Sequence, residues 1–203
     1  MIENIIFDLN KVIVTYENHP DKNQLDNEHI GLLGLSQKEF WKTAMEYFDE
    51  YNEGRVNFSG YMKIVFDELD IPYSRIPMMQ ELHARCFHFV EGMQEILDSL
   101  SSKYKMILLA GDGFEAEKMK LDAFDIRKYF DKIYMTCHER TNKEDPAIYQ
   151  KVLAQNNLEP DKTLFIDDLT KHTRVAEQSG IHAIQFKNSR QLKMELGKYN
   201  ILI

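Results

Sequence analysis

The sequence predicts an α/β fold, with a Rossmann-like parallel sheet and an inserted helical segment. Residues 4–7 form a short, largely apolar stretch that stops at Asp8, as a buried strand stops at the edge of a sheet. From about residue 92 onward, strand-like apolar stretches alternate with helix-like stretches. This alternation is typical of a parallel sheet that is covered by helices on both faces.

A long, mostly helical segment separates the first strand from the alternating part of the chain. The segment has about 80 residues, whereas an ordinary connection between a strand and the next helix has only a few. We therefore expect an α/β core formed by residues 1–14 and 91–203, and an inserted helical cap formed by residues 15–90.

The cap is predicted to contain at least three helices. The first covers residues 36–54, because Ser36 and Glu39 have the spacing of a capping box and Gly54 follows the last apolar position. Two more helices are predicted at about residues 59–69 and 78–89. Most large side chains of the cap are expected to form its packing core, and a few of them to face the site: Trp41, Met45, Phe48, Tyr61, Phe66, Met78 and Met79.

The α/β core is predicted to continue with four more strands and five helices. The strands are expected at residues 105–110, 132–136, 163–167 and 182–186. The helices are expected at residues 93–100, 114–124, 145–157, 171–180 and 189–196.

The composition excludes several classes of protein. The 203 residues are 43% hydrophobic and 11% aromatic, which is enough for a packed core. The net charge is -8 and no block of Lys and Arg occurs, so a nucleic-acid partner is not expected. No apolar run reaches the ~18 residues of a membrane span, and the two cysteines, Cys86 and Cys137, are far apart. We expect a cytoplasmic protein with buried thiols, as a monomer or homodimer.

Carboxylates and a lysine follow three of the predicted strands. Asp8 ends the first strand, Asp167 and Asp168 end the strand at 163–167, and Lys143 lies in a loop before a helix. Each could be a turn, cap or surface residue when it is considered alone. However, ligands of open α/β sheets bind at the carboxyl ends of the strands, where these groups would meet.

Three carboxylates at one edge of a sheet repel one another unless a cation lies between them. Oxygen ligands together with substrate phosphate are typical of Mg²⁺ sites. A lysine nearby can balance the charge of a phosphoryl group, and a carboxylate can attack phosphorus to form an aspartyl-phosphate. The pattern therefore favours a Mg²⁺-dependent reaction on a small phosphorylated metabolite.

The four segments with these residues resemble the motifs of the haloacid dehalogenase superfamily of hydrolases. The order and spacing match along essentially the whole chain, and residues 51–72 are similar to the helical cap of these proteins. The motif segments are "IIFDLNKVIV", "KMILLAGDG", "KEDPAIYQKVL" and "LFIDD".

The resemblance implies a role for each residue. Asp8 is implied as the nucleophile and a Mg²⁺ ligand, and the backbone carbonyl of Asn10 as a second ligand. Asp168 is implied to bind the metal directly, and Asp167 through water or as support. Lys143 is implied to hold the nucleophile and the phosphoryl oxygens.

Two positions depart from the family pattern. Asn10 stands where the family has the aspartate that acts as general acid and base, and an amide cannot give up a proton at neutral pH. Ala110, followed by Gly111, stands where the family has the Ser or Thr hydroxyl that binds the phosphoryl group. General acid–base catalysis is typically worth about 10²–10⁴-fold. We therefore predict a weak phosphatase, or one restricted to good leaving groups.

Three other functions are compatible with parts of the pattern. The chain could be a catalytically inactive metal- and phosphate-binding protein with a regulatory role, because Asn10 and Ala110 replace two catalytic residues of the family pattern. Dehalogenation needs no metal, so the pair Asp167 and Asp168 argues against it. A receiver domain has its paired acids at the first strand, whereas here the pair comes late. His172, which follows Asp168, is interpreted as a surface or core histidine.

Overall fold

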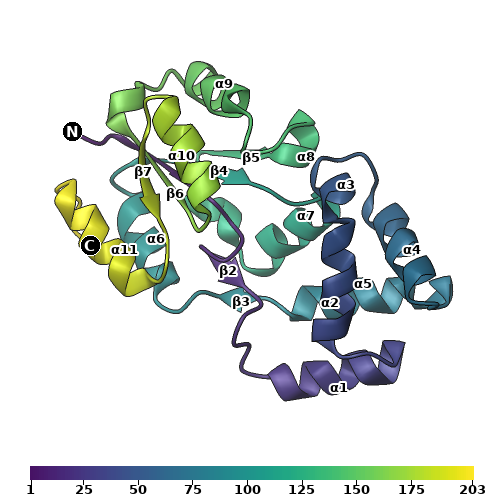
Figure 1. Cartoon of the computed structure of the whole chain (residues 1–203). Coiled ribbons are helices and arrows are strands. Elements are labelled where there is room, and N and C mark those ends of the chain that lie inside the picture. Colours follow the sequence, from purple (N-terminus) through teal and green to yellow (C-terminus); the bar gives the residue numbers. More distant parts are fainter.

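The computed structural model describes residues 1–203 and confirms the predicted α/β class. Five parallel strands form one sheet in the order β5-β4-β1-β6-β7, with the N-terminal strand at its centre (Figure 1). The strands are β1 (Asn4–Phe7), β4 (Lys105–Ala110), β5 (Lys132–Met135), β6 (Thr163–Asp167) and β7 (His182–Gln185). Because β1 has a neighbour on each side, its carboxyl end lies between those of β4 and β6.

Helices cover both faces of this sheet. Ile5 and Phe7 of β1 belong to one hydrophobic cluster and Ile6 to another, as the two-residue period of a strand requires. The first cluster includes residues of α6 and α11, and the second includes residues of α9 and α10. The helices of the core are α6 (Met93–Ser101), α7 (Phe114–Ala123), α8 (Thr136–Glu139), α9 (Pro146–Asn156), α10 (Thr170–Gln178) and α11 (Ser189–Lys198).

Five further helices lie between β1 and β4 in the sequence, and we call them the cap helices. They are α1 (Lys22–Leu33), α2 (Gln37–Glu46), α3 (Phe48–Asn52), α4 (Phe58–Glu68) and α5 (Ile76–Arg85). A short antiparallel pair, β2 (Val14–Thr15) with β3 (His88–Phe89), joins them to the core. Figure 1 shows the cap helices on one side of the molecule, away from the outer strand β7. The division at residues 14 and 91 stays a prediction.

Two predicted cap helices differ from those in the structure. The predicted helix 36–54 begins with the expected capping box of Ser36 and Glu39, but it is divided at Tyr47 into α2 and α3. The predicted helix at 78–89 starts earlier, at Ile76, and ends at Arg85, because His88 and Phe89 pair with β2. Helix α1 was not predicted, since its sequence is polar and buries only Leu25 and His29.

The large side chains of the cap do not all serve as packing core. Tyr61, Phe66 and Met79 are buried in a hydrophobic cluster formed mainly by the cap helices, as predicted. Met45 is 58% exposed and lines a cavity beside Asp8, so it is one of the side chains that face the site. The prediction was wrong for Met78, which is 51% exposed and does not line this cavity.

Helix α3 is one of the cap helices that contact the core. The backbone N–H of Ala116 donates a hydrogen bond of 2.9 Å to the hydroxyl of Tyr51. A Cβ atom at Gly113 would lie 2.0 Å from the Tyr51 ring, so only glycine fits at this contact. The hydroxyl of Thr136 also donates to the backbone oxygen of Asn52 at 3.3 Å. Cap and core are therefore in direct contact beside the carboxyl ends of β4 and β5.

Candidate active site

The structure brings Asp8, Lys143 and Asp167 together at the carboxyl ends of β1 and β6. The ammonium nitrogen Nζ of Lys143 lies 2.5 Å from Oδ1 of Asp8 and 2.8 Å from Oδ2 of Asp167. All three side chains are almost completely buried. Burial alone would lower the pKa of Lys143, but the charges of Asp167 and Asp8 raise it above its usual value, so the side chain stays a cation.

The loop that delivers Lys143 is fixed by its neighbours. The carboxylate of Asp145 caps α9 by accepting a hydrogen bond of 2.9 Å from the N–H of Ala147, and Pro146 occupies the first helical turn. The hydroxyl of Tyr149, one turn further on, donates to the backbone oxygen of Lys143 at 3.0 Å. The sequence Lys-Glu-Asp-Pro therefore sets both the start of the helix and the position of the lysine.

Asp167 and Asp168 have different partners although they are adjacent. Oδ1 of Asp167 accepts a hydrogen bond of 2.8 Å from the N–H of Leu169, and Nδ1 of His172 lies 3.0 Å from both of its carboxylate oxygens. The carboxylate of Asp168, by contrast, forms no ion pair with a Lys, Arg or His side chain and belongs to the cluster of three carboxylates at this edge. Asp167 is therefore used to hold the loop and Lys143, whereas Asp168 is available for a ligand.

The three aspartates form a cluster that fits a divalent cation. One carboxylate oxygen each from Asp8, Asp167 and Asp168 lies within 4.8 Å of the others. The backbone oxygen of Asn10, at the same edge, accepts no hydrogen bond in the chain. A set of hard oxygen donors at this spacing is what Mg²⁺ prefers.

The electrostatics of the cluster also favour a cation. Burial raises the pKa of Asp8 to about 7, against the opposing effect of Lys143, and the charges of Asp167 and Asp168 raise it further. Burial and the charge of Asp167 also raise the pKa of Asp168. A bound cation would offset this repulsion.

Asn10 belongs to a second group of polar side chains, which we call the Asn10 group. Lys120 Nζ donates to Oδ1 of Asn10 at 2.8 Å, and Nδ2 of Asn10 lies 3.3 Å from Oδ2 of Asp112. Lys120 and Asp112 also form an ion pair that is almost completely buried. Both oxygen and nitrogen of the Asn10 amide are thus engaged by the protein.

The start of α7, next to Ala110, offers fewer donors than a free helix N-terminus. The N–H of Gly113 donates to the carboxylate of its neighbour Asp112, and the N–H of Ala116 donates to the hydroxyl oxygen of Tyr51. The N–H groups of Gly111, Leu9 and Asn10 make no hydrogen bond within the chain. These three N–H groups therefore have no partner within the chain.

Sequence reasoning missed two residues of this site: Lys120 and His172. His172 was interpreted as a surface or core residue, yet it lies against Asp167. Its position one helical turn after the Asp-Asp pair was the available signal. Lys120 carries no such signal, because only the packing of α7 brings it to Asn10, whereas Asp112 follows strand β4 directly within the segment "KMILLAGDG".

The chain matches the family model of the haloacid dehalogenase-like hydrolases over residues 5–186. The chain therefore belongs to this family, as its motifs predicted. A D-ribitol-5-phosphate phosphatase from Bacteroides thetaiotaomicron is 23% identical over 209 residues, covering 97% of both chains. A phosphorylated carbohydrates phosphatase from Thermotoga maritima is 25% identical, covering 90% of this chain and 84% of its own.

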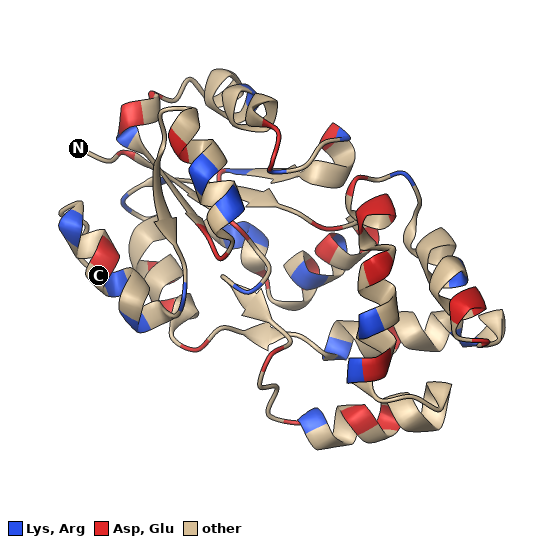
Figure 2. Ribbon diagram, viewed as in Figure 1, with Lys and Arg blue, Asp and Glu red and all other residues tan.

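Solved structures support the fold. A haloacid dehalogenase family enzyme from Bacteroides thetaiotaomicron, in complex with magnesium and inorganic phosphate, has a TM-score of 0.71 at 18% identity. The match covers 93% of this chain and 96% of that enzyme. None of the helices of this chain is long and apolar enough to cross a membrane. Figure 2 shows Lys and Arg scattered over both the core and the cap helices.

Proposed function

We propose that this chain is a Mg²⁺-dependent phosphatase that acts on a small phosphorylated metabolite. The observation that supports this best is Lys143, bound between Asp8 and Asp167 beside the open carboxylate of Asp168. Two relatives that match most of the chain are named as phosphatases, which supports the same reaction.

In this proposal Asp8 is the nucleophile. Its Oδ2 accepts no hydrogen bond within the chain, whereas Oδ1 is held by Lys143. Attack of Oδ2 on phosphorus forms an aspartyl-phosphate and breaks the bond to the leaving oxygen, which departs as an anion and takes its proton from solvent. Water then hydrolyses the aspartyl-phosphate to phosphate and the free carboxylate. Bound Mg²⁺ supplies positive charge that balances the phosphoryl group and the carboxylates. Asp8, Asp168 and the backbone oxygen of Asn10 are the ligands proposed for it, with Asp167 in support.

The phosphoryl oxygens have donors that do not depend on a hydroxyl at Ala110. Lys143 and the N–H groups of Leu9, Asn10 and Gly111 are the donors proposed for them. Preorganised donors of this kind stabilise charge in the transition state. The loss of the Ser or Thr hydroxyl therefore weakens the site without removing it.

Phosphate release from a panel of esters tests the proposal. We expect release from acyl, aryl, sugar and alkyl phosphates in that approximate order, only with Mg²⁺, because Asn10 cannot protonate a poor leaving group. The Asp8→Asn variant serves as the blank. Release that is equal with and without Mg²⁺, or equal to the blank, would contradict the proposal.

The affinity for Mg²⁺ should depend on pH. Because the pKa of Asp8 is raised to about 7, the metal-free carboxyl carries a proton below that pH, and Mg²⁺ must displace it. We expect the dissociation constant to fall about tenfold per unit between pH 5 and 7 and to level off above pH 7. Titration calorimetry at pH 5.5, 6.5 and 8 measures this, and a flat profile would contradict it.

An exchange of two side chains should restore a general acid. Asp at position 10 alone would face the carboxylate of Asp112, because Asn10 Nδ2 and Asp112 Oδ2 are 3.3 Å apart. The double variant N10D/D112N keeps the net charge and leaves Lys120 with one carboxylate partner. We expect the double variant to raise kcat on alkyl phosphates about 10²-fold, and N10D alone to raise it less.

The D112N variant is the matched control for this exchange, since it changes the same contact without supplying an acid. Activity on aryl phosphates should change little in the double variant, because their leaving groups need no proton. A double variant that folds, binds Mg²⁺ and gains nothing on alkyl phosphates would contradict this explanation of Asn10.

A second candidate function is supported by the Asn10 group itself. The amide of Asn10 is bonded on both sides, to Lys120 and Asp112, and thus has a structural role in this chain. A nearly inactive, regulatory protein that binds metal and phosphate would keep such a site. Binding of inorganic phosphate and Mg²⁺ without turnover of any ester in the panel would favour this candidate.

A further inference from the structure

A cavity of about 450 Å³ connects the catalytic edge with the cap helices. On the core side it is lined by polar residues of the site, including Asp8, Lys143 and Asp168. On the cap side it is lined mainly by large apolar and aromatic side chains. A volume of this size is within the usual range of pockets for small molecules.

Four rings on the cap side form a continuous surface that we call the aromatic wall: Trp41, Phe58, His83 and Phe87. The rings of Trp41 and His83 have centroids 5.0 Å apart, and those of His83 and Phe87 are 5.1 Å apart. The ring centroid of Phe58 lies 6.1 Å from that of His83. All four rings line the cavity.

The aromatic wall begins next to the catalytic edge. Nζ of Lys120 lies 4.1 Å from the centroid of the Phe87 ring and also donates to Asn10. Asn10 stands two residues after Asp8, where the family pattern places the group that faces the leaving oxygen. The part of a substrate that leaves from phosphorus would therefore meet Phe87 first and the rest of the wall beyond it.

The wall carries no charge at neutral pH. Burial, together with the charge of Lys120, lowers the pKa of His83 to about 3, so its imidazole is neutral. The charge of Lys120 is balanced by its ion pair with Asp112. His83 makes no hydrogen bond within the chain, and neither does Nε1 of Trp41.

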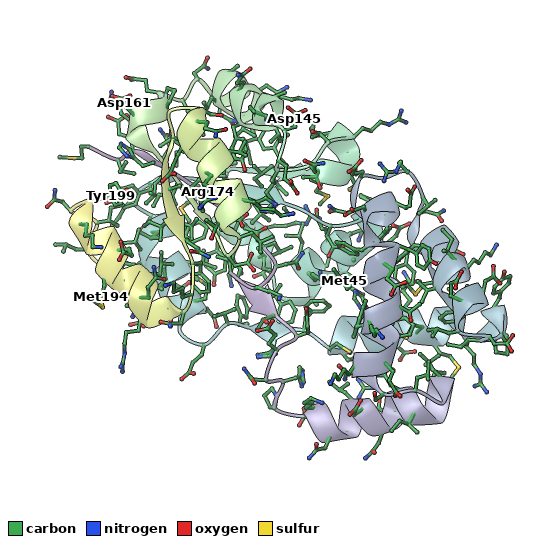
Figure 3. All side chains as sticks on the ribbon, viewed as in Figure 1. Met45, Asp145, Asp161, Arg174, Met194 and Tyr199 are labelled. Atoms are coloured by element: carbon green, nitrogen blue, oxygen red, sulfur yellow. The ribbon has the colours of Figure 1, made fainter.

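Exposed side chains of two kinds line the cavity: the charged Asp49, Glu144 and Lys171, and large apolar or aromatic ones. Met45 is 58% exposed and Tyr16 is 42% exposed, and both line the cavity. Figure 3 shows Met45 on the side of α2 that faces the core.

We propose that the leaving group of the substrate contains a flat apolar ring, which packs on the aromatic wall. This inference rests on the phosphatase activity proposed above and names the substrate class of that site. A ring gains contact area and edge-to-face interactions with the wall. On the wall itself a linear polyol would find only ring nitrogens, such as Nδ1 of His83 and Nε1 of Trp41, as hydrogen-bond partners. Its remaining hydroxyl groups would be buried against carbon without a partner, which is costly.

Two alkyl esters with similar leaving-group chemistry test the ring preference. 2-Phenylethyl phosphate has the ring, and a pentitol phosphate has hydroxyl groups in its place. We expect kcat/KM to be at least about tenfold higher for the phenylethyl ester, with Mg²⁺ present. Equal values, or a preference for the pentitol ester, would overturn the inference.

Binding of phosphonates tests the wall without any turnover. We expect 2-phenylethylphosphonate to bind at least about tenfold more tightly than methylphosphonate in the presence of Mg²⁺. The Met45→Ala variant should reduce this ratio about threefold to tenfold. Met78→Ala is the matched control, because Met78 is 51% exposed on a cap helix but lies outside the cavity, and it should leave the ratio unchanged.

The two proposals fail in different ways. If no ester is hydrolysed but the phosphonates keep the ring preference, the phosphatase activity is overturned and the ring site stands. If esters are hydrolysed but the two phosphonates bind equally, or neither binds, the ring site is overturned. An equal effect of Met45→Ala and Met78→Ala would also overturn it.

Discussion

The Asp8→Asn variant is expected to lose at least about 10⁴-fold in kcat for every ester that the wild-type chain hydrolyses. An amide cannot attack phosphorus and is a weaker ligand for Mg²⁺ than a carboxylate. The amide is nevertheless of the same size, and its oxygen can still accept the hydrogen bond that Lys143 donates at 2.5 Å. The loss should therefore come from chemistry and metal binding rather than from a collapsed site.

Phosphate release and thermal unfolding of the same samples separate these effects. Asp98→Asn is a suitable control, because Asp98 is exposed on α6 and does not line the cavity of the site. The same substitution there should leave kcat unchanged. An Asp8→Asn variant that retained activity within tenfold of the wild type would rule out Asp8 as the nucleophile.

The Lys143→Met variant is expected to be less stable by about 3–5 kcal/mol, measured in the absence of divalent cations. The substitution leaves Asp8 and Asp167 buried without their shared cation, while the cluster also contains Asp168. Saturating Mg²⁺ should restore part of the stability, because a bound ion supplies positive charge and binds only the folded protein.

Urea denaturation with and without Mg²⁺ measures both effects. Lys171→Met is the matched control, because Lys171 forms an ion pair with Glu144 in which both side chains are more than half exposed. Exposed pairs contribute about 0–1 kcal/mol, so this control should change little. Equal destabilisation by the two substitutions would contradict the central electrostatic role assigned to Lys143.

The sequence predicted those parts of the site that depend on local pattern. Asp8 and Asp167 end apolar strands, and the carboxyl ends of neighbouring parallel strands must meet, so their proximity followed from the order of the elements. The position of Lys143 followed from the Asp145-Pro146 helix start. The sheet was predicted from the alternation of strands and helices after residue 92. Each of these strands is buried on both faces, which produces a run of apolar residues that is easy to recognise.

The features that sequence reasoning missed depend on tertiary packing. Lys120 reaches Asn10 only because α7 packs beside the cap, and nothing in the helix sequence marks that side chain as buried. The break at Tyr47 was missed because the apolar spacing of α2 continues into α3. The pair β2 and β3 has only two residues in each strand, which is too short for a recognisable alternation.

The contact between Asn10 and Asp112 has a consequence for how such a site evolves. A single change of Asn10 to Asp would place two carboxylates about the width of one hydrogen bond apart, so the intermediate genotype gains an acid and a repulsion together. Because N10D alone is still expected to raise kcat, although less than the double variant does, the residue at position 112 sets how much activity a carboxylate at position 10 can restore.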